Sequence, residues 1–475
     1  MSFDSVTFLI FFPVVTALYF AFPHRYRAAL LLVASVIFYM AFIPSYIFIL
    51  LVTIVVDYIA GRLIETSQPT RRHLFLVLSI LVNVGFLAFF KYFNFLNDNL
   101  SVVTRLLHQP NPISNLNILL PIGLSFHTFQ AMSYTIEIYM GRQKAERNFG
   151  IFALYVLFYP QLVAGPIERP QNLLHQFREK HFFEYARVVS GLKLMAWGFF
   201  KKIVIANGMA QLVNPIYNKP HGQSGLAFLF ATICFAFQIY ADFAGYTDIA
   251  RGSARVMGFS LMENFKSPYL SSSVSQFWTR WHISLSTWFK DYLYIPLGGN
   301  RVPFWRWQTN LLIVFLISGL WHGAKWTFVI WGLLHAVYLI VEHCWRRWGK
   351  AMALPLSPEA RTRWSTVLVF SVVTLAWIFF RANNVSDAFY IVSRLGTDWT
   401  WPVVRDLFHH GPVNVYMMVA LVIFLLFAES TRGVALYERV ISPNAKLRWA
   451  SYYLLITAIF FFGTFGNNKF IYFQF

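Results

Sequence analysis

The sequence predicts an all-α polytopic membrane protein, and three observations support this fold class. Of the 475 residues, 57% are hydrophobic and 12% are charged, whereas about a quarter of the residues in a soluble protein are charged. Apolar runs near the roughly 20 residues that cross a bilayer recur along the chain. The formal charge of +19 is scattered between these runs, as in the cytoplasmic loops of membrane proteins, so we expect no nucleic-acid partner.

Candidate membrane helices follow one another from the N-terminus to the C-terminus. No Lys or Arg precedes the first run and no small-residue cleavage site follows it, so we expect a permanent helix and not a signal peptide. Pro44 predicts a tight hairpin between the second and third runs. The runs lie at about 5–22, 28–43, 45–60, 73–93, 116–136, 149–165, 190–213, 225–247, 309–323, 325–343, 365–381, 413–429 and 449–466.

Basic residues between the runs predict the orientation, because Lys and Arg concentrate in cytoplasmic loops. Counting from either end puts both termini outward, but the two counts disagree between residues 149 and 213. We therefore expect one of the runs 149–165 and 190–213 to be re-entrant. Non-helical backbone at membrane depth must be buried in protein or line a cavity, so a re-entrant element indicates an internal site.

The polar connections are too short to form a sizeable domain outside the bilayer. The longest, 94–115 and 382–412, are predicted to face outward. We expect one integral membrane domain over 1–475, with N-terminal helices over 1–148, a catalytic core with re-entrant elements over 149–345 and C-terminal helices over 346–475.

The first candidate for chemistry is the stretch 276–300, QFWTRWHISLSTWFKDYLYIPLGGN. At helical spacing its aromatic residues share one face, with His282 at the border of the polar face. An interfacial helix with Trp at the headgroups would show the same pattern. The apolar face would hold Trp278, Trp281, Leu285, Trp288, Phe289 and Tyr292, and the polar face Arg280, Ser284, Thr287, Lys290 and Asp291.

The second candidate is GLWHGAKW, residues 319–326, which joins two apolar runs. His322 stands between Trp321 and Gly323. A charged side chain at the bilayer centre costs roughly 2.5–3.5 kcal/mol, so such residues usually face a cavity or a partner. Gly319 and Gly323 have the four-residue spacing that lets helix backbones approach closely. The alternative is a helix-packing motif that contains a hydrogen-bonded histidine.

Other polar groups give weaker signals. Asp242 and Asp248 end an apolar run and would also suit ordinary interfacial carboxylates. His335, Glu342 and His343 are spread over two helical turns, so we predict no metal site. Cys234 and Cys344 lie in or beside apolar runs and are expected to be separate thiols. HExxH, Walker A, GxSxG and a GxGxxG after a strand are absent from the sequence, which disfavours phosphoryl transfer, hydride transfer and serine hydrolysis.

Several segments together resemble the membrane-bound O-acyltransferase (MBOAT) family, and within it the branch of bacterial alginate O-acetyltransferase membrane subunits. The resemblance runs almost end to end. It rests on YPQLVAGPIERP (159–170), YADFAGYTDIARG (240–252), FWTRWHISLSTWFKDYLYIPLGGNR (277–301), SGLWHGAKWTFVIWGLLH (318–335) and FIYFQF (470–475).

The resemblance implies a fold of about 10–12 transmembrane helices, with re-entrant and interfacial helices around a central funnel or tunnel. It implies a bacterial inner-membrane enzyme that uses cytoplasmic acetyl-CoA, with no permanently bound cofactor, to O-acetylate an exported polysaccharide such as alginate. Peptidoglycan, cellulose or another exopolysaccharide is the alternative acceptor. A periplasmic or extracellular acetyltransferase protein is the expected partner. A transporter, whose motifs are usually paired in two halves, and a non-catalytic export scaffold are the rival functions.

The invariant histidine of the family falls on His322 and the second histidine on His282. We expect His322 to act as general base, and His282 to orient a substrate or stabilise charge on the thioester oxygen. Direct transfer and transfer through an acyl-histidine both remain open. His127 replaces an aromatic residue usual in the branch and is left out of the site. The supporting residues are Trp321, Gly319, Gly323, Arg280, Trp281, Asp291, Asn300 and Asp242, and the cations expected to attract the CoA phosphates are Arg280, Lys290 and Arg301.

Overall fold

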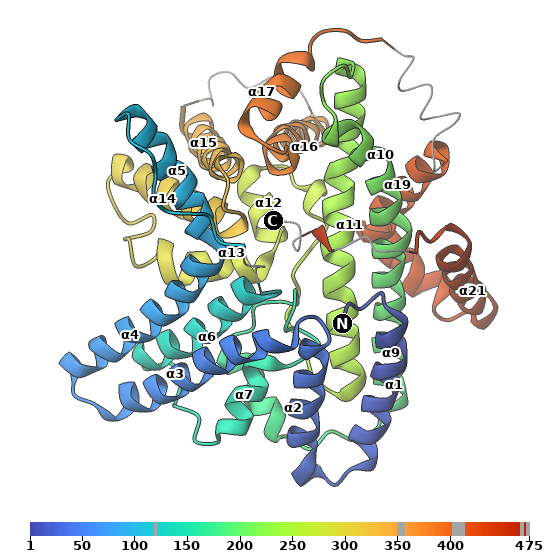
Figure 1. The fold of residues 1–475 in the computed structure, drawn as a ribbon. Coiled ribbons are helices and arrows are strands. Elements are labelled where there is room, and N and C mark those ends of the chain that lie inside the picture. The colour runs from blue at the N-terminus through green and yellow to red at the C-terminus, as the bar shows by residue number, and fades with distance from the viewer. Residues whose placement is uncertain (118–120, 349–356, 401–413, 466–469, 472–475) are drawn as a thin grey trace. The chain divides into compact units, whose positions relative to one another are not determined.

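The computed structural model describes residues 1–117, 121–348, 357–400, 414–465 and 470–471. Within these ranges the regular structure is helical and contains no strand, which confirms the predicted all-α class (Figure 1). The chain forms two compact units. The first contains Met1–Met195 and Tyr246–Met262, and the second contains Ala196–Gly245 and Glu263–Phe475. The finer division predicted at residues 148 and 345 stays a prediction.

The first unit is built from the N-terminal helices. Pro44 begins the short 3₁₀ helix Pro44–Tyr46 that separates α2 from α3, so the chain turns at the predicted position, while the tight hairpin stays a prediction. Helices α3, α4 and α6 pack against one another (Figure 1). The helices of this unit are α1 (Val6–Ala21), α2 (His24–Met40), α3 (Ile47–Thr66), α4 (Pro69–Leu87), α5 (Phe93–Leu106), α6 (Leu124–Tyr139), α7 (Phe149–Leu157) and α8 (Pro170–Leu173).

Buried polar side chains join α3, α4 and α6. The Asp57 carboxylate accepts hydrogen bonds from Ser79 Oγ and from Asn83 Nδ2. His127 Nε2 lies 2.6 Å from Thr53 Oγ1, on α3. His127 is therefore part of a helix-packing contact within the first unit.

The structure distinguishes the two runs between which the orientation counts disagreed. Helix α7 has 9 residues and, at about 1.5 Å per residue, spans about 13.5 Å of a hydrocarbon core roughly 30 Å thick. The buried chain that follows, 158–165, is not helical. Run 190–213 lies instead in one continuous helical stretch, composed of α9 (Tyr185–Phe199), a π-helix (Phe200–Ala206) and α10 (Asn207–Asn218). Run 149–165 therefore contains only a short helix. Neither run is among the described helices that are long and apolar enough to cross a membrane, so which of the two is re-entrant stays a prediction.

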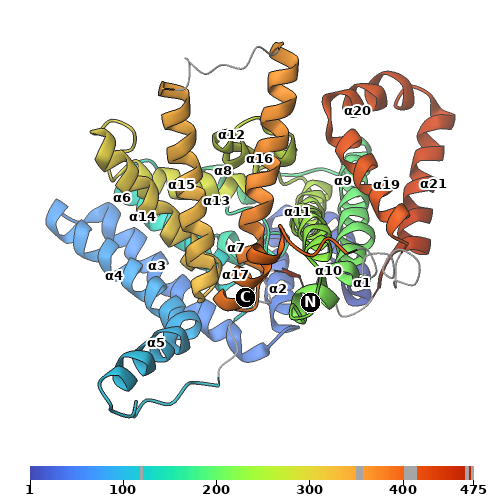
Figure 2. The same ribbon diagram turned by 90° about the horizontal axis from the view of Figure 1, so that it is seen from above.

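The second unit contains the C-terminal helices, and α11 (Gly225–Met257) begins in it. Helices α15 and α16 lie side by side (Figure 2). The other helices are α12 (Val274–Arg280), α13 (Ile283–Phe289), α14 (Phe304–His322), α15 (Trp326–Trp348), α16 (Pro358–Arg381), α17 (Val385–Arg394), α19 (Val415–Glu429), α20 (Thr431–Leu436) and α21 (Ala445–Phe462).

Glycines allow α14 and α15 to cross closely. A Cβ atom on Gly319 would lie 2.3 Å from the backbone oxygen of Phe328, and one on Gly332 would lie 2.2 Å from that of Phe315. Either substitution requires the backbones to move apart. The close approach expected at Gly319 is thus present, with Gly332 on the facing helix.

Five helical stretches of the described residues are long and apolar enough to cross a membrane. The bent pair Val415–Glu429 and Thr431–Ile441, with 73° between its members, would make a sixth. The protein is therefore a multi-pass membrane protein. The other predicted runs form shorter, broken or less apolar helices, so helix length alone gives fewer spans than the expected 10–12. The five stretches are Pro44–Thr66, Pro69–Leu106, Gly225–Met257, Trp326–Arg347 and Pro358–Arg381.

The alternative of one amphipathic helix over 276–300 is wrong, because the chain breaks in the middle of this range. Helix α12 ends at Arg280, His282 adopts a left-handed conformation with φ of 44°, and α13 begins at Ile283. A π-helix, Lys290–Tyr294, and a turn at Gly298 and Gly299 follow. The reason lies in tertiary packing. The break buries His282, which the helical pattern had placed at the border of the polar face, and Ser284, which it had placed on that face.

Candidate active site

His322 lies at a junction of three helices in the second unit. It is the last residue of α14 and is 4% exposed. Its ring centroid lies 4.9 Å from that of Trp331 on α15 and 5.4 Å from that of Phe380 on α16. The next residue, Gly323, leaves no room for a side chain, since a Cβ there would lie 2.1 Å from the Phe328 ring. The glycine lets the chain turn tightly around the histidine.

His282 occupies the break between α12 and α13, where it is fully buried. Its Nδ1 lies 3.2 Å from Asn264 Oδ1, which also accepts a hydrogen bond of 3.1 Å from the backbone N–H of Ser284. The backbone oxygen of Asn264 accepts a further bond of 2.9 Å from Ile283. One asparagine therefore binds the left-handed residue and the two residues that follow it.

These contacts determine which nitrogen of His282 carries the proton. The Ser284 backbone N–H can only donate, so the Asn264 atom facing it is the oxygen. His282 Nδ1 must then be the donor to that oxygen, and Nε2 holds the lone pair. Burial lowers the pKa of His282 to about 3, because a charged ring would lose its hydration. His282 is therefore a neutral imidazole at physiological pH.

Trp321 contacts both histidines. Its ring centroid is 5.0 Å from that of His322 and 6.1 Å from that of His282. Phe243 of α11 packs edge-on against His282 with centroids 4.6 Å apart. The structure thus brings the two predicted catalytic histidines into contact with one predicted supporting residue.

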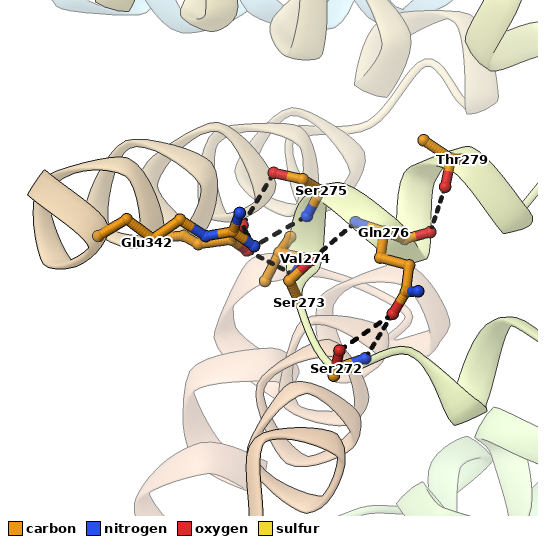
Figure 3. A network of polar contacts seen from close by, with 8 residues as sticks. Ser272, Ser273, Val274, Ser275, Gln276, Thr279 and Glu342 are labelled. Carbon is orange, nitrogen blue, oxygen red and sulfur yellow. Dashed lines mark hydrogen bonds and ion pairs between the residues drawn. The ribbon is translucent and has the colours of Figure 1, made fainter. Parts of the chain in front are cut away.

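Helix α12 is anchored to α15 at its first turn (Figure 3). The Glu342 carboxylate of α15 accepts hydrogen bonds from the backbone N–H groups of Val274, at 2.5 Å, and Ser275, at 3.2 Å, and from Ser275 Oγ, at 2.9 Å. A carboxylate at a helix N-terminus satisfies free N–H groups and interacts favourably with the helix dipole. Because α15 also carries Trp331, one helix positions the elements that hold both histidines.

The other two residues weighed with Glu342 occupy separate places on α15. His335 is fully buried, with its ring centroid 4.9 Å from those of Trp278 and Trp331. His343 is exposed and packs on Trp307 at 4.4 Å. Each of the two histidines therefore has its own aromatic surroundings.

Asp242, predicted as a supporting residue, joins α11 to two other segments of the second unit. One carboxylate oxygen lies 2.6 Å from Lys202 Nζ, and the other accepts a hydrogen bond of 2.7 Å from the backbone N–H of Ile471. The neighbouring Phe470 packs against Phe243, the residue in contact with His282. Asp242 therefore holds residues 470–471 against the part of α11 that contacts the histidine.

The remaining predicted residues differ in their burial. Trp281 is buried and packs against Trp377 with centroids 5.0 Å apart. Half-buried Arg280 donates to the backbone oxygen of Leu270 at 3.3 Å. Asp291 is half-buried in the π-helix, and Asn300, Lys290 and Arg301 are exposed. The CoA-phosphate role of Arg280, Lys290 and Arg301 stays a prediction.

Sequence reasoning missed Asn264 and Phe380. Asn264 stands 18 residues before His282 in a non-helical segment, where no periodicity identifies it. Phe380 is one aromatic residue among many at the end of an apolar run. Neither position carries a local signal, because its role depends on contacts between distant segments.

Comparisons with known proteins show the family of the chain. The sequence profile of the MBOAT, membrane-bound O-acyltransferase family, matches residues 143–382, which include both histidines. Probable alginate O-acetylase AlgI of Pseudomonas aeruginosa is 37% identical over 406 residues, covering 84% of this chain and 76% of that protein. The Azotobacter vinelandii protein of the same name is 37% identical over 409 residues, covering 84% and 79%. Peptidoglycan O-acetyltransferase of Helicobacter pylori is 35% identical over 393 residues, covering 76% and 72%. This chain therefore belongs to the membrane-bound O-acyltransferase family.

Proposed function

We propose that this membrane O-acetyltransferase takes acetyl from cytoplasmic acetyl-CoA and passes it across the bacterial inner membrane for the O-acetylation of an exported polysaccharide such as alginate. The observation that carries the proposal is the pair of buried histidines, His282 and His322, which both contact Trp321 within the segment that matches the family. Acetyl-CoA is a substrate in this proposal, and no resident cofactor is required.

His322 acts as the general base. A thioester is already activated, so the enzyme chiefly has to position an acceptor hydroxyl and remove its proton. The imidazole takes that proton while the hydroxyl oxygen bonds to the acetyl carbonyl carbon. The tetrahedral intermediate then expels the CoA thiolate, which recovers the proton as a thiol. General-base assistance of this kind typically accelerates a reaction about 10²- to 10⁴-fold.

His282 orients the acceptor hydroxyl and does not stabilise the oxyanion. Its Nδ1–H is bound by Asn264, so the neutral ring presents a lone pair at Nε2. A lone pair accepts a hydrogen bond from a hydroxyl, whereas oxyanion stabilisation requires a donor. Adding a proton at Nε2 would oppose the pKa of about 3 that burial gives this residue. The tautomer therefore favours the first of the two roles considered for His282.

The names of the relatives support the choice of acceptor polymer. Two of the similar proteins carry the name alginate O-acetylase and one the name peptidoglycan O-acetyltransferase. We place this chain with the alginate type, with peptidoglycan, cellulose or another exopolysaccharide as the alternative acceptor. A periplasmic or extracellular acetyltransferase completes the transfer to the polymer.

Inverted membrane vesicles from cells that export the polymer test the donor side. Isotope-labelled acetyl-CoA is added outside, where it meets the cytoplasmic face, and label is measured in material inside the vesicles. We expect labelling by the wild type and by the control His343→Ala, and loss of labelling in His322→Ala at equal protein content. Equal labelling by His322→Ala would support a transporter or scaffold and overturn the enzymatic reading. Label that reaches the inside of His322→Ala vesicles as unreacted acetyl-CoA would also support a transporter.

A further inference from the structure

A polar pocket opens in the second unit where two membrane-crossing helices end. Its volume is about 240 Å³. Lys325 directly precedes the apolar stretch Trp326–Arg347, and Arg381 is the last residue of the apolar stretch Pro358–Arg381. Both cations therefore lie where a membrane helix leaves the hydrocarbon core and meets the headgroups. The lining residues are Asn214, Asn218, Lys325, Phe328, Phe380, Arg381, Ala382 and Asn383.

Arg381 is held in place by uncharged partners. Its Nη2 donates hydrogen bonds of 2.9 Å to Asn214 Oδ1 and 2.8 Å to Asn218 Oδ1. The guanidinium carbon lies 5.4 Å from the centre of the Tyr217 ring. Amide oxygens and an aromatic face fix the orientation of the guanidinium without neutralising its charge. The N–H groups on its other nitrogens have no hydrogen-bond acceptor among the described residues, so they can bind a ligand.

Lys325 brings a second positive charge to the pocket. Neither Lys325 nor Arg381 forms an ion pair within the part of the chain that the structure describes. The carboxylate nearest to Arg381 along the chain, Asp387, accepts a hydrogen bond from Asn383 Nδ2 at 3.3 Å and lies 3.8 Å from His221 Nε2. The pocket therefore has an excess of positive charge, which favours an anionic ligand.

The helix surfaces beside the pocket suit a lipid better than a soluble anion. Trp326, directly after Lys325, is exposed, and so are Leu333 on α15 and Leu375 on α16. Exposed apolar side chains on a membrane helix face acyl chains, and tryptophan is enriched at the level of the headgroups. The pocket is smaller than the roughly 300–1,000 Å³ of pockets for whole small ligands. It would therefore hold a headgroup while the acyl chains stay outside.

We propose that this pocket binds the phosphate of an anionic phospholipid headgroup, such as that of phosphatidylglycerol. Phosphate oxygens accept charge-assisted hydrogen bonds from guanidinium and ammonium groups, and clustered positive charge at a membrane surface attracts anionic lipids. A headgroup bound to both cations would connect the start of α15 with the end of α16. The proposal concerns a site separate from the acetyl transfer and does not depend on it.

The bound lipid would stabilise the helix junction at His322. Phe328 and Phe380 belong to the lining of the pocket and pack against each other with ring centroids 4.9 Å apart. The Phe380 ring also packs against His322, with centroids 5.4 Å apart. A ligand that binds the native protein and not the unfolded chain stabilises the native protein. The helix ends that carry these two rings are the parts that the lipid would hold together.

Native mass spectrometry on the full chain in detergent micelles counts the lipid molecules that each protein molecule retains. The probes are phosphatidylglycerol, phosphatidylcholine with the same acyl chains, inorganic phosphate and an acidic peptide, tetraglutamate. We expect the wild type to retain one phosphatidylglycerol more tightly than any further one. It should also retain this lipid more tightly than phosphatidylcholine, whose headgroup has no net charge. Arg381→Gln should weaken the tight binding about ten- to a hundredfold.

Three further variants separate the charge of the pocket from its packing. Arg381→Lys keeps the positive charge and should bind phosphatidylglycerol more tightly than Arg381→Gln. Lys325→Gln removes an exposed side chain and should weaken binding about two- to fivefold, which keeps the proposal testable if Arg381→Gln does not fold. The control Arg363→Gln removes an exposed arginine near the other end of α16, outside the pocket, and should keep wild-type binding.

Several results would overturn the proposal. Unchanged binding in both Arg381→Gln and Lys325→Gln would do so, as would equally tight binding of phosphatidylglycerol and phosphatidylcholine. Equal weakening in Arg381→Lys and Arg381→Gln would show that the charge at this position does not bind the lipid. Displacement of the lipid by inorganic phosphate at similar concentration would assign the pocket to a free anion. Displacement by the acidic peptide would assign it to a protein partner.

Discussion

Replacing Asn264 with alanine should impair the function of His282 while leaving the histidine itself in the sequence. The single Oδ1 atom accepts from His282 Nδ1, at 3.2 Å, from the Ser284 backbone N–H, at 3.1 Å, and from Ser284 Oγ, at 3.0 Å. All three residues are at most 1% exposed, so water does not readily replace the lost acceptor. The Ser284 hydroxyl can rotate to another partner, which leaves two buried N–H donors unsatisfied.

The cost follows from those two donors. Each unsatisfied buried donor costs about 1–3 kcal/mol, so Asn264→Ala should lose about 2–6 kcal/mol of stability, a substantial part of the roughly 5–15 kcal/mol of a typical protein. The variant should also lose the tautomer of His282, and a misplaced catalytic group typically costs about 10²-fold in rate. Ser284→Ala is the matched control, because it removes the hydroxyl and keeps the Asn264–His282 bond. Its rate should remain within about threefold of the wild type.

A double-mutant cycle measures whether Asn264 acts through His282. The assay is the initial rate of acetyl incorporation by membrane vesicles at equal protein content, with thermal stability in detergent measured in parallel. Asn264→Ala and His282→Ala should each lose about 10²-fold, and the double variant should be no more than about twofold worse than either. Additive losses, near 10⁴-fold, would refute the reasoning, as would a stable Asn264→Ala protein with a normal rate.

Three further predictions concern stability. The pKa of His282 is about 3 when folded and 6.5 in its unperturbed state, so the unfolded chain takes up this proton first as pH falls. The free energy of unfolding should therefore decline below pH 6.5, by at most about 1.4 kcal/mol per pH unit from this group. His282→Gln should flatten this decline. The same pH dependence in the variant and the wild type would argue against a buried neutral ring. Gly319→Ala places a Cβ 2.3 Å from the Phe328 oxygen and should cost about 1–3 kcal/mol. In the control Gly85→Ala the new Cβ has no neighbouring atom within 4 Å, so the substitution should stabilise α4 by up to about 1 kcal/mol in thermal unfolding. An equal loss of stability in both variants would contradict the close helix crossing. Asp242→Asn leaves Lys202 buried without its carboxylate and should cost about 3–5 kcal/mol; adding Lys202→Met should recover part of that loss, and no recovery would mean that the ion pair is not its cause.

The sequence predicts features of the fold that depend on local composition. Long apolar runs locate most of the helices, and Pro44 locates the turn between α2 and α3. The early end of α7 at Leu157 is not visible in the apolar run 149–165, which continues to residue 165. Hydrophobic periodicity does not predict the break at His282. It is stabilised by Asn264, 18 residues away, against a helical pattern that continues through the break.

The residues of the candidate site also fall into those that the sequence identifies and those that only the structure shows. Residue type, membrane context and the family resemblance identified His282, His322 and Trp321. The partners that position them come from other segments: Phe380 from α16, and Glu342 from the far end of α15. Asp242 was selected as a carboxylate at the end of an apolar run, but its partner Lys202 stands 40 residues earlier in a π-helix. Only tertiary packing shows such pairings.

The acetyl content of the exported polymer tests the central claim, that His322 carries out the transfer, most directly. Acetyl groups are counted by NMR on polymer from cells that make the wild type, His322→Ala or the control His343→Ala, with each protein quantified in the membrane. A loss of general-base catalysis lowers the rate about 10²- to 10⁴-fold, so His322→Ala should give the acetyl content of cells that lack the protein, and His343→Ala that of the wild type. Normal acetylation by a stably produced His322→Ala protein would contradict the claim.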